Sequence, residues 1–130
     1  MLEIGIKHEI SQLVDETNTA SAFRSGLLDV FATPAMIALM EYTSYKSVEP
    51  YLGEGQGTVG TLVDVKHLAA TPIGLQVTCK SELVEVDRRR LRFHVECIDE
   101  TGETIGEGFH ERFIIDSDKF MEKCDAKRAK

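Results

Sequence analysis

An apolar run within residues 31–51 predicts a buried helix. Thr33 is a good N-cap, Pro34 suits the first helical position, and the six residues that follow carry no polar side chain. A helix that is apolar nearly all round belongs inside a core or a membrane, and this run is too short to span a bilayer. We therefore predict a core helix that ends near Pro50, because the residue before a proline avoids helical backbone angles.

Alternating apolar and polar positions, which are typical of half-buried strands, fill much of the remaining chain. Residues 2–14 alternate loosely, and four longer segments rich in β-branched residues follow the helix: 58–68, 74–86, 89–99 and 103–115. Because turn-like residues separate these four segments, we expect an antiparallel meander. Residues 117–126 suit a short terminal helix. Together these elements predict an α+β fold in which a curved antiparallel sheet wraps the long central helix.

Length, charge and cysteine content narrow the classes of protein and partner. We expect 130 residues to form one domain, residues 1–130, and a net charge of −7 disfavours nucleic acids and anionic membranes as partners. Three cysteines without metal-like spacing, and no signal peptide or membrane-spanning run, favour the reducing cytoplasm. The glycine cluster at 53–57 lacks the lysine and the flanking elements of a phosphate-binding loop. We therefore expect neither a cofactor nor a metal.

Glu41 and His67 are the first candidates for chemistry. Glu41 ends the apolar run, so we expect part of its surroundings to be dry, and a dry carboxylate has either a partner or a raised pKa. Strand alternation puts His67 on the face of its strand that carries valines, where a charged or acceptor partner would be valuable. Each residue alone could be structural. Together they form a pair that can hold a water or hydroxyl group, take its proton and stabilise the imidazolium.

Thr33 is a third candidate, either as a nucleophile, as a holder of water or only as a helix cap. Eight residues separate it from Glu41, which corresponds to about 12 Å along one helix. One chain can hardly bring both side chains to a single imidazole. If all three residues serve one site, Thr33 and Glu41 are expected to come from different subunits, which argues for a dimer.

Three stretches of the chain resemble the hotdog-fold thioesterases, and specifically the fluoroacetyl-CoA thioesterase-like group. They read VFATPAMIALMEYTSYKSVEPYL, EGQGTVGTLVDVKHLAATPIG and EGFHERFII, and the likeness extends from about residue 30 to residue 115. The resemblance implies an acyl-CoA thioesterase that forms a homodimer or a dimer of dimers, with sites at the subunit interface. It implies a catalytic set at Thr33, Glu41 and His67, an oxyanion or carbonyl contact at Gly60, and a basic site residue at Arg112.

The chain departs from this group in the segment just before the helix. The namesake enzymes carry phenylalanines there that shape the acyl pocket, whereas this chain has Arg24 and Leu27 at the aligned positions, with Phe23 one position off. The resemblance therefore implies thioester hydrolysis and leaves the acyl group open.

Two alternatives to a thioesterase are a hotdog dehydratase or hydratase and a non-catalytic protein that binds acyl-CoA or another small ligand. Hotdog dehydratases usually place the histidine before the helix glutamate, whereas here Glu41 precedes His67. That order favours the thioesterase. In a binding protein, the two residues would simply bond each other inside the core.

Overall fold

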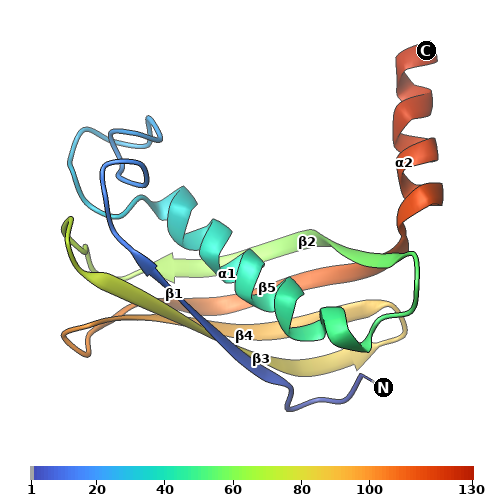
Figure 1. The fold of residues 1–130 in the computed structure, drawn as a ribbon, viewed down its shortest axis with the longest axis horizontal. Coiled ribbons are helices and arrows are strands. Elements are labelled where there is room, and N and C mark those ends of the chain that lie inside the picture. The colour runs from blue at the N-terminus through green and yellow to red at the C-terminus, as the bar shows by residue number, and fades with distance from the viewer. Residues whose placement is uncertain (1) are drawn as a thin grey trace.

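The computed structural model describes residues 2–130, which form an antiparallel sheet of five strands with a long helix on one face (Figure 1). The α+β class and the hotdog arrangement of sheet and helix are thus as predicted. The elements are β1 (Lys7–Leu13), α1 (Thr33–Val48), η1 (Glu49–Tyr51), β2 (Gln56–His67), β3 (Gln76–Asp87), β4 (Arg90–Asp99), β5 (Thr104–Asp116), α2 (Ser117–Asp125) and η2 (Ala126–Ala129). None of the helices in residues 2–130 is both long and apolar enough to cross a membrane.

The order of the strands across the sheet is β1-β3-β4-β5-β2, so the predicted meander is correct only for β3, β4 and β5. β2 pairs with β5 instead of β3, and the pairing continues just beyond its end, where Leu68 N–H donates to Ile105 O at 2.7 Å. The segment between β2 and β3 must therefore pass the ends of β5 and β4. On the way, Thr71 O accepts from Phe31 N–H at 2.8 Å. β1 and β2 therefore form the two edges of the sheet.

The core lies between α1 and the inner face of the sheet. β4 shows the pattern most clearly, because its alternate residues Leu91, Phe93, Val95 and Cys97 are fully buried. On α1, the apolar side chains that face the sheet include Met36, Leu39 and Met40. Full burial of each large apolar side chain contributes about 1.5–3 kcal/mol to folding.

The start of α1 differs from the prediction in one respect. Ala32 is the N-cap, with extended backbone angles and no side-chain capping bond, and Thr33 and Pro34 are the first two helical residues. Thr33 is therefore not the cap. Its hydroxyl group is bonded elsewhere, to the imidazole of His67.

Candidate active site

The first cluster of candidate residues joins the start of α1 to the end of β2. Thr33 Oγ1 lies 2.7 Å from His67 Nδ1. Both residues line a cavity of about 330 Å³, and its other walls come from the loop before α1 and the segment after β2: Ala20, Ser25, Val30, Phe31, Leu68, Ala69 and Ala70. These small and apolar side chains line an open pocket beside the hydroxyl group.

Burial lowers the pKa of His67 below its ordinary value, and the nearby backbone of Ala69 opposes that shift. His67 Nε2 is itself buried and has no hydrogen-bond partner among residues 2–130. In the neutral tautomer with its proton on Nε2, the imidazole accepts a hydrogen bond from the Thr33 hydroxyl group at Nδ1. The cluster therefore presents an unprotonated base next to a hydroxyl group, which is the arrangement that general-base chemistry requires.

The second cluster lies farther along α1, against the middle of β2 and β5. Glu41 Oε2 is 3.7 Å from Arg112 Nη1, and the ring of Tyr45 lies under the guanidinium with its centroid 5.5 Å away. Arg112 is buried, and Thr58 accepts from it twice, at its hydroxyl oxygen (2.7 Å) and its carbonyl oxygen (2.9 Å). A buried guanidinium that is bonded in this way has a fixed position.

Glu41 is less buried than the apolar run predicted, with 40% of its side chain exposed in the single chain. The physical reason is the position of β2, which is an edge strand with no further strand beyond it. The carboxylate therefore reaches Arg112 on one side and remains open on the other. In the single chain, that open side is where a further group can approach.

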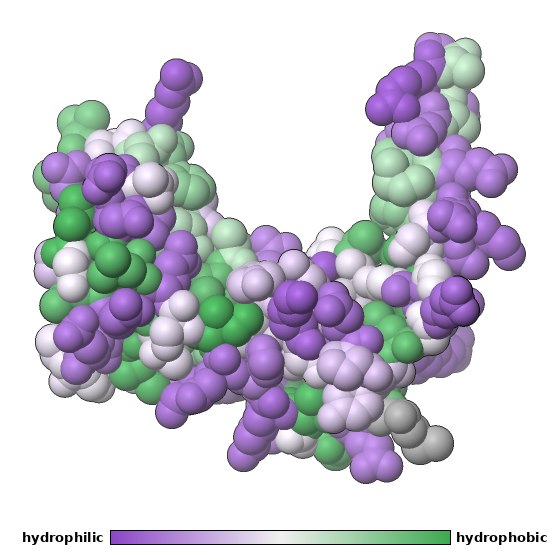
Figure 2. Space-filling view, viewed as in Figure 1, coloured by the Kyte–Doolittle hydropathy of each residue, from purple (hydrophilic) through white to green (hydrophobic). Residues whose placement is uncertain are grey.

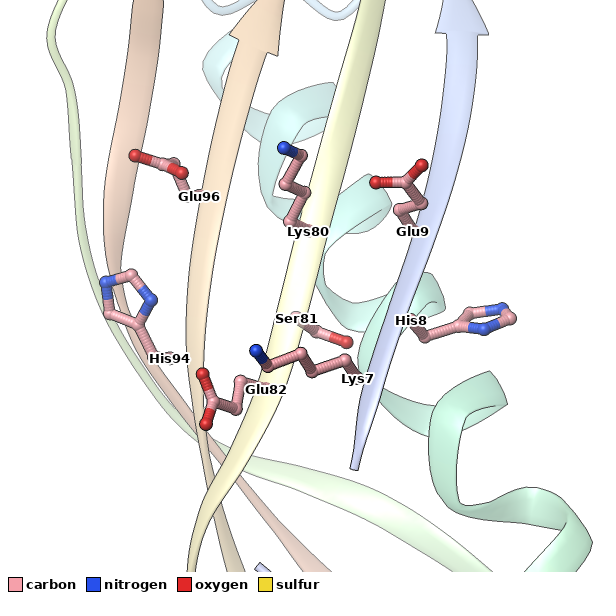
Figure 3. A pocket seen from close by; sticks show the side chains of 8 residues that line it. All are labelled: Lys7, His8, Glu9, Lys80, Ser81, Glu82, His94 and Glu96. Atoms are coloured by element: carbon pink, nitrogen blue, oxygen red, sulfur yellow. The ribbon is translucent and has the colours of Figure 1, made fainter. Parts of the chain in front are cut away.

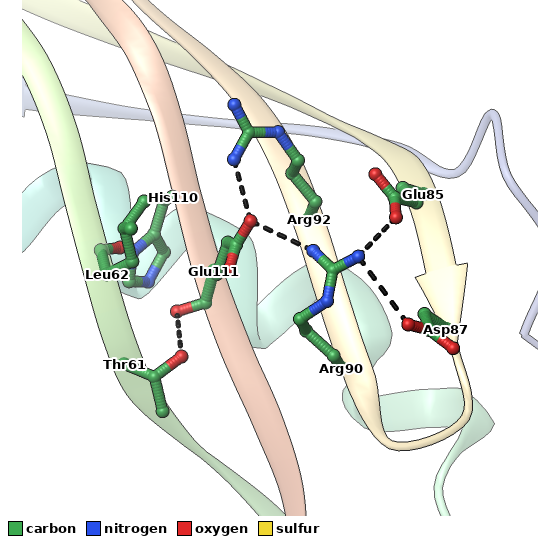
Figure 4. Close-up of polar contacts among 8 residues, drawn as sticks. All are labelled: Thr61, Leu62, Glu85, Asp87, Arg90, Arg92, His110 and Glu111. Carbon is green, nitrogen blue, oxygen red and sulfur yellow. Dashed lines mark hydrogen bonds and ion pairs between the residues drawn. The ribbon is translucent and has the colours of Figure 1, made fainter.

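His110 is a site residue that the sequence reasoning missed. It is buried, and its Nδ1 lies 2.8 Å from the carbonyl oxygen of Leu62, which Figure 4 draws beside it. Arg112 Nη1 donates to its Nε2 at 3.1 Å. Because a carbonyl only accepts and a guanidinium only donates, the proton must be on Nδ1 and the ring must be neutral. Burial, followed by the charge of Arg112, lowers the pKa of His110. Alternation along the motif HER would have placed His110 on the same face as Arg112.

Gly60 provides the space in which this second cluster forms. A Cβ atom at this position would lie 2.9 Å from Glu41 Oε2 and 3.2 Å from His110 Cε1. The pairing of β2 with β5 also shifts here, since Gly60 faces Arg112 and Leu62 faces Glu111, which leaves Thr61 as the extra residue of a β-bulge.

Glu111 holds this bulge from the outer face of the sheet (Figure 4). Its carbonyl oxygen accepts from the Thr61 hydroxyl at 3.3 Å, and its carboxylate accepts from Arg90 at 2.9 Å and from Arg92 at 2.6 Å. His110 holds the same region from the inner face through Leu62. The position of Gly60 is thus fixed from both sides of the sheet.

The structure brings the five predicted residues together as two groups. Thr33 and His67 form one group, and Glu41, Gly60 and Arg112 form the other. Glu41 and His67, expected to be partners, share no hydrogen bond or ion pair within residues 2–130 of one chain. The reason is the length of α1, which separates the first helical residue from Glu41 by about 12 Å.

A larger groove, of about 640 Å³, lies across β1, β3 and β4 and contains none of these residues. Figure 3 shows its lining side chains, which carry charges of both signs. Lys7 faces Glu82 across β1 and β3, and Lys80 faces Glu9 and Glu96 on its two sides. Such cross-strand pairs are typical of a solvated sheet surface, so the groove is not the candidate active site.

Comparison with known proteins shows the class to which this fold belongs. The solved structure of the fluoroacetyl-CoA thioesterase FlK superposes with a TM-score of 0.92 and 35% identity, covering 98% of each chain. A hot-dog-like protein from Thermanaerovibrio acidaminovorans superposes with a TM-score of 0.85 and 25% identity, over 96% of this chain and 91% of that one. The architecture is therefore that of a hotdog-fold thioesterase.

The family is shown by the sequence itself. The family described as fluoroacetyl-CoA-specific thioesterase matches residues 14–118. The fluoroacetyl-CoA thioesterase of Streptantibioticus cattleyicolor is 46% identical over 99 residues, which are 76% of this chain and 70% of that protein. The chain belongs to the fluoroacetyl-CoA-specific thioesterase family and is a thioester hydrolase, as the resemblance implied.

Replacing His110 by Phe tests whether its hydrogen bonds hold the second cluster. The substitution keeps an aromatic ring at this buried position. It leaves Leu62 O and Arg112 Nη1 without their partner, which should lower the free energy of unfolding by about 1–3 kcal/mol. Urea unfolding of both proteins measures the difference. Unchanged stability would mean that neither bond contributes to folding.

Replacing Gly60 by Ala tests whether the missing side chain matters for the site. The added methyl group meets the mobile end of Glu41, so the fold should survive while the carboxylate moves away from Arg112. We expect kcat/KM for thioester hydrolysis to fall by roughly tenfold to a hundredfold. Gly57→Ala, on the same strand, is the matched control and should keep normal activity. Equal activity of the two variants would contradict this role of Gly60.

Proposed function

We propose that this protein hydrolyses the thioester of a small acyl-CoA as a homodimer, with each active site shared between two subunits. Thr33 and His67 come from one subunit, and Glu41, Gly60 and Arg112 come from the other. The observation that carries this proposal is the division of the five residues into two groups along a strand whose outer edge is free.

The free edge of β2 is a suitable surface for pairing two subunits. β2 bonds to β5 on one side, and within residues 2–130 no strand lies on its other side. Its twelve residues include the exposed side chains of Leu62 and Val63. A long, exposed edge with apolar side chains is a ready template for another strand, and a symmetric pair of identical strands closes the assembly.

Antiparallel pairing of β2 with its copy would bring the two groups together. His67 lies at the end of β2, whereas Gly60 lies in its first half. A two-fold axis reverses the direction of one strand, and of its α1, relative to the other. The first turn of one helix then lies beside later turns of its partner, so Thr33 of one subunit can face Glu41 of the other.

The reaction follows from what each group can do. The neutral imidazole of His67 accepts a proton from water or from the Thr33 hydroxyl, and the resulting nucleophile attacks the thioester carbonyl carbon. The Gly60 backbone N–H and the Arg112 guanidinium stabilise the negative charge on the carbonyl oxygen. The C–S bond then breaks, and the imidazolium returns its proton to the leaving thiolate. Where Thr33 is the nucleophile, His67 then takes a proton from a water molecule, which attacks the Thr33 ester, releases the acid and restores the Thr33 hydroxyl group. Glu41 orients the attacking group and stabilises the imidazolium.

A short acyl chain suits the first cluster, because the open pocket of about 330 Å³ beside Thr33 is lined by small residues and by Phe31. Fluoroacetyl-CoA, which the relatives' names record, is one member of that class. Arg24 and Leu27 stand where the namesake enzymes carry phenylalanines, so we propose short acyl-CoAs as a class and not fluoroacetyl-CoA alone.

The three free cysteines fit the reducing cytoplasm, where we place the reaction.

Turnover of a panel of short, branched and aromatic acyl-CoAs tests the proposed activity. A thiol reagent detects released CoA, and the absorbance of an enoyl thioester would reveal a dehydratase instead.

Glu41→Gln should lower kcat/KM by about a hundredfold or more, because the amide cannot carry the charge. Glu49→Gln, just beyond α1, is the control and should be normal. Near-normal turnover by Glu41→Gln would remove Glu41 from the mechanism, and acyl-CoA binding without turnover would favour a binding protein.

The pH dependence of hydrolysis tests the role of His67. Only the neutral imidazole accepts a proton, so activity should rise with pH through the pKa of His67. Burial lowers that pKa, whereas the carboxylate of the partner's Glu41 would raise it. The midpoint should therefore move to lower pH in the residual activity of Glu41→Gln. The limb should vanish in His67→Ala, and its persistence there would assign it to another group.

A further inference from the structure

We propose that α2 of each subunit packs on the loop of residues 15–32 of its partner and covers the Thr33–His67 end of the partner's site. This inference rests on the homodimer of the proposed function. It concerns which segment closes the site, and not which residues perform the chemistry.

Within residues 2–130, α2 packs no side chain into a core. The helix has nine residues, Asp116 caps it by accepting from Lys119 N–H at 3.2 Å, and none of its residues is buried. In Figure 1 it leaves the end of β5 and stands away from the sheet. Isolated helices of this length are marginal in water, and protein helices gain most of their stability from packing an apolar face. α2 therefore requires a partner surface.

The apolar face of α2 identifies the chemistry of that surface. Phe120, Met121 and Cys124 lie three or four residues apart or adjacent, so they share one side of the helix, and all three are exposed. An apolar face of this kind packs against other apolar side chains. The occupant must therefore present exposed apolar residues.

The loop before α1 presents such residues in this same chain. Leu27 is 94% exposed, and Phe23 and Leu28 are exposed as well. The loop also supplies Val30 and Phe31 to the cavity beside Thr33, so a segment packed on it lies at the mouth of that cavity. Figure 2 shows the loop and α2 as two projections with a hollow between them.

The length of β2 prevents α2 from reaching the loop of its own chain. Gln56, at the start of β2, pairs with Asp116 at the foot of α2, whereas His67, at its end, bonds Thr33 at the foot of the loop. The two ends of a strand of twelve residues are about 35 Å apart. A helix of nine residues is only about 13 Å long.

A second copy of the chain removes that distance. Antiparallel pairing of the free edge of β2 with its copy puts the start of one strand beside the end of the other. The helix that begins next to Gln56 of one subunit then lies beside the loop that adjoins His67 of the other. The two-fold axis creates this contact twice, so both exposed apolar sets are covered by the same assembly.

Cross-linking between a cysteine in the loop and Cys124 tests the contact directly. Cys79 and Cys97 are fully buried, so Cys124 is the exposed thiol of the described residues. In Leu27→Cys, a short bis-maleimide should join residues 27 and 124 of different chains, as shown by peptide mapping of a mixture of 14N- and 15N-labelled protein. The double variant Leu27→Cys/Cys124→Ser must not give this product. In Glu9→Cys, whose new thiol lies on the opposite edge of the sheet, the reagent must not join residues 9 and 124.

A second variant measures what the contact contributes. Phe120→Ser should raise the dimer dissociation constant by about tenfold, since it removes an apolar side chain from the interface, whereas Lys123→Ser on the same helix should not. Sedimentation of both variants gives the comparison. Equal dissociation constants would overturn the proposed packing of α2.

The outcomes separate this inference from the proposed function when acyl-CoA hydrolysis is measured on the unsubstituted protein, because Leu27 stands at an acyl-pocket position. A dimer that hydrolyses acyl-CoA but forms no linkage between residues 27 and 124 of different chains overturns the α2 contact and leaves the chemistry intact. A protein that forms the linkage but does not hydrolyse overturns the proposed function only. A monomeric chain overturns the shared site and the α2 contact together.

Discussion

The distance along α1 between Thr33 and Glu41 is the constraint on which the rest of the site depends. A helix is rigid, so about 12 Å separate the two backbones whatever the surrounding side chains do. Each end is then fixed by different strands: His67 at the end of β2 bonds Thr33, and Arg112 on β5 approaches Glu41. One chain therefore holds two separate groups of candidate residues. The edge of β2 that no described strand covers is the surface through which we propose that a second chain joins them.

Arg112 organises the second group of candidate residues, and its neighbours offset the cost of removing its charge from water. Burial lowers the pKa of Arg112, and the carboxylate of Glu41 opposes that shift. A buried guanidinium is tolerated only when its N–H groups have acceptors, which Thr58 and the neutral ring of His110 supply. Gly60 completes the arrangement by leaving the space that the carboxylate occupies. The basic group is thus held firmly beside the thioester position that we propose.

Much of this fold could be predicted from the sequence, because local patterns determine local structure. The apolar run predicted α1, and alternation predicted β2 to β5 to within two residues, whereas β1 begins five residues later than predicted. The pairing of β2 with β5 was missed, since it depends on the path of residues 68–75 under the loop before α1, which no local pattern encodes. His110 was missed for a different reason: in a run of three charged or polar residues, a histidine is easily taken for a surface residue until the burial of that strand face is known.

Mixed dimers test the shared site most directly. His67→Ala and Glu41→Gln would each be prepared as homodimers with little activity, then combined and purified as the mixed dimer with two affinity tags. If each site takes His67 from one subunit and Glu41 from the other, both lesions fall in one site and the other site is intact. Roughly half of native activity should then return, because separate sites act independently when they share no residues. A purified mixed dimer as inactive as its parents would contradict the shared site.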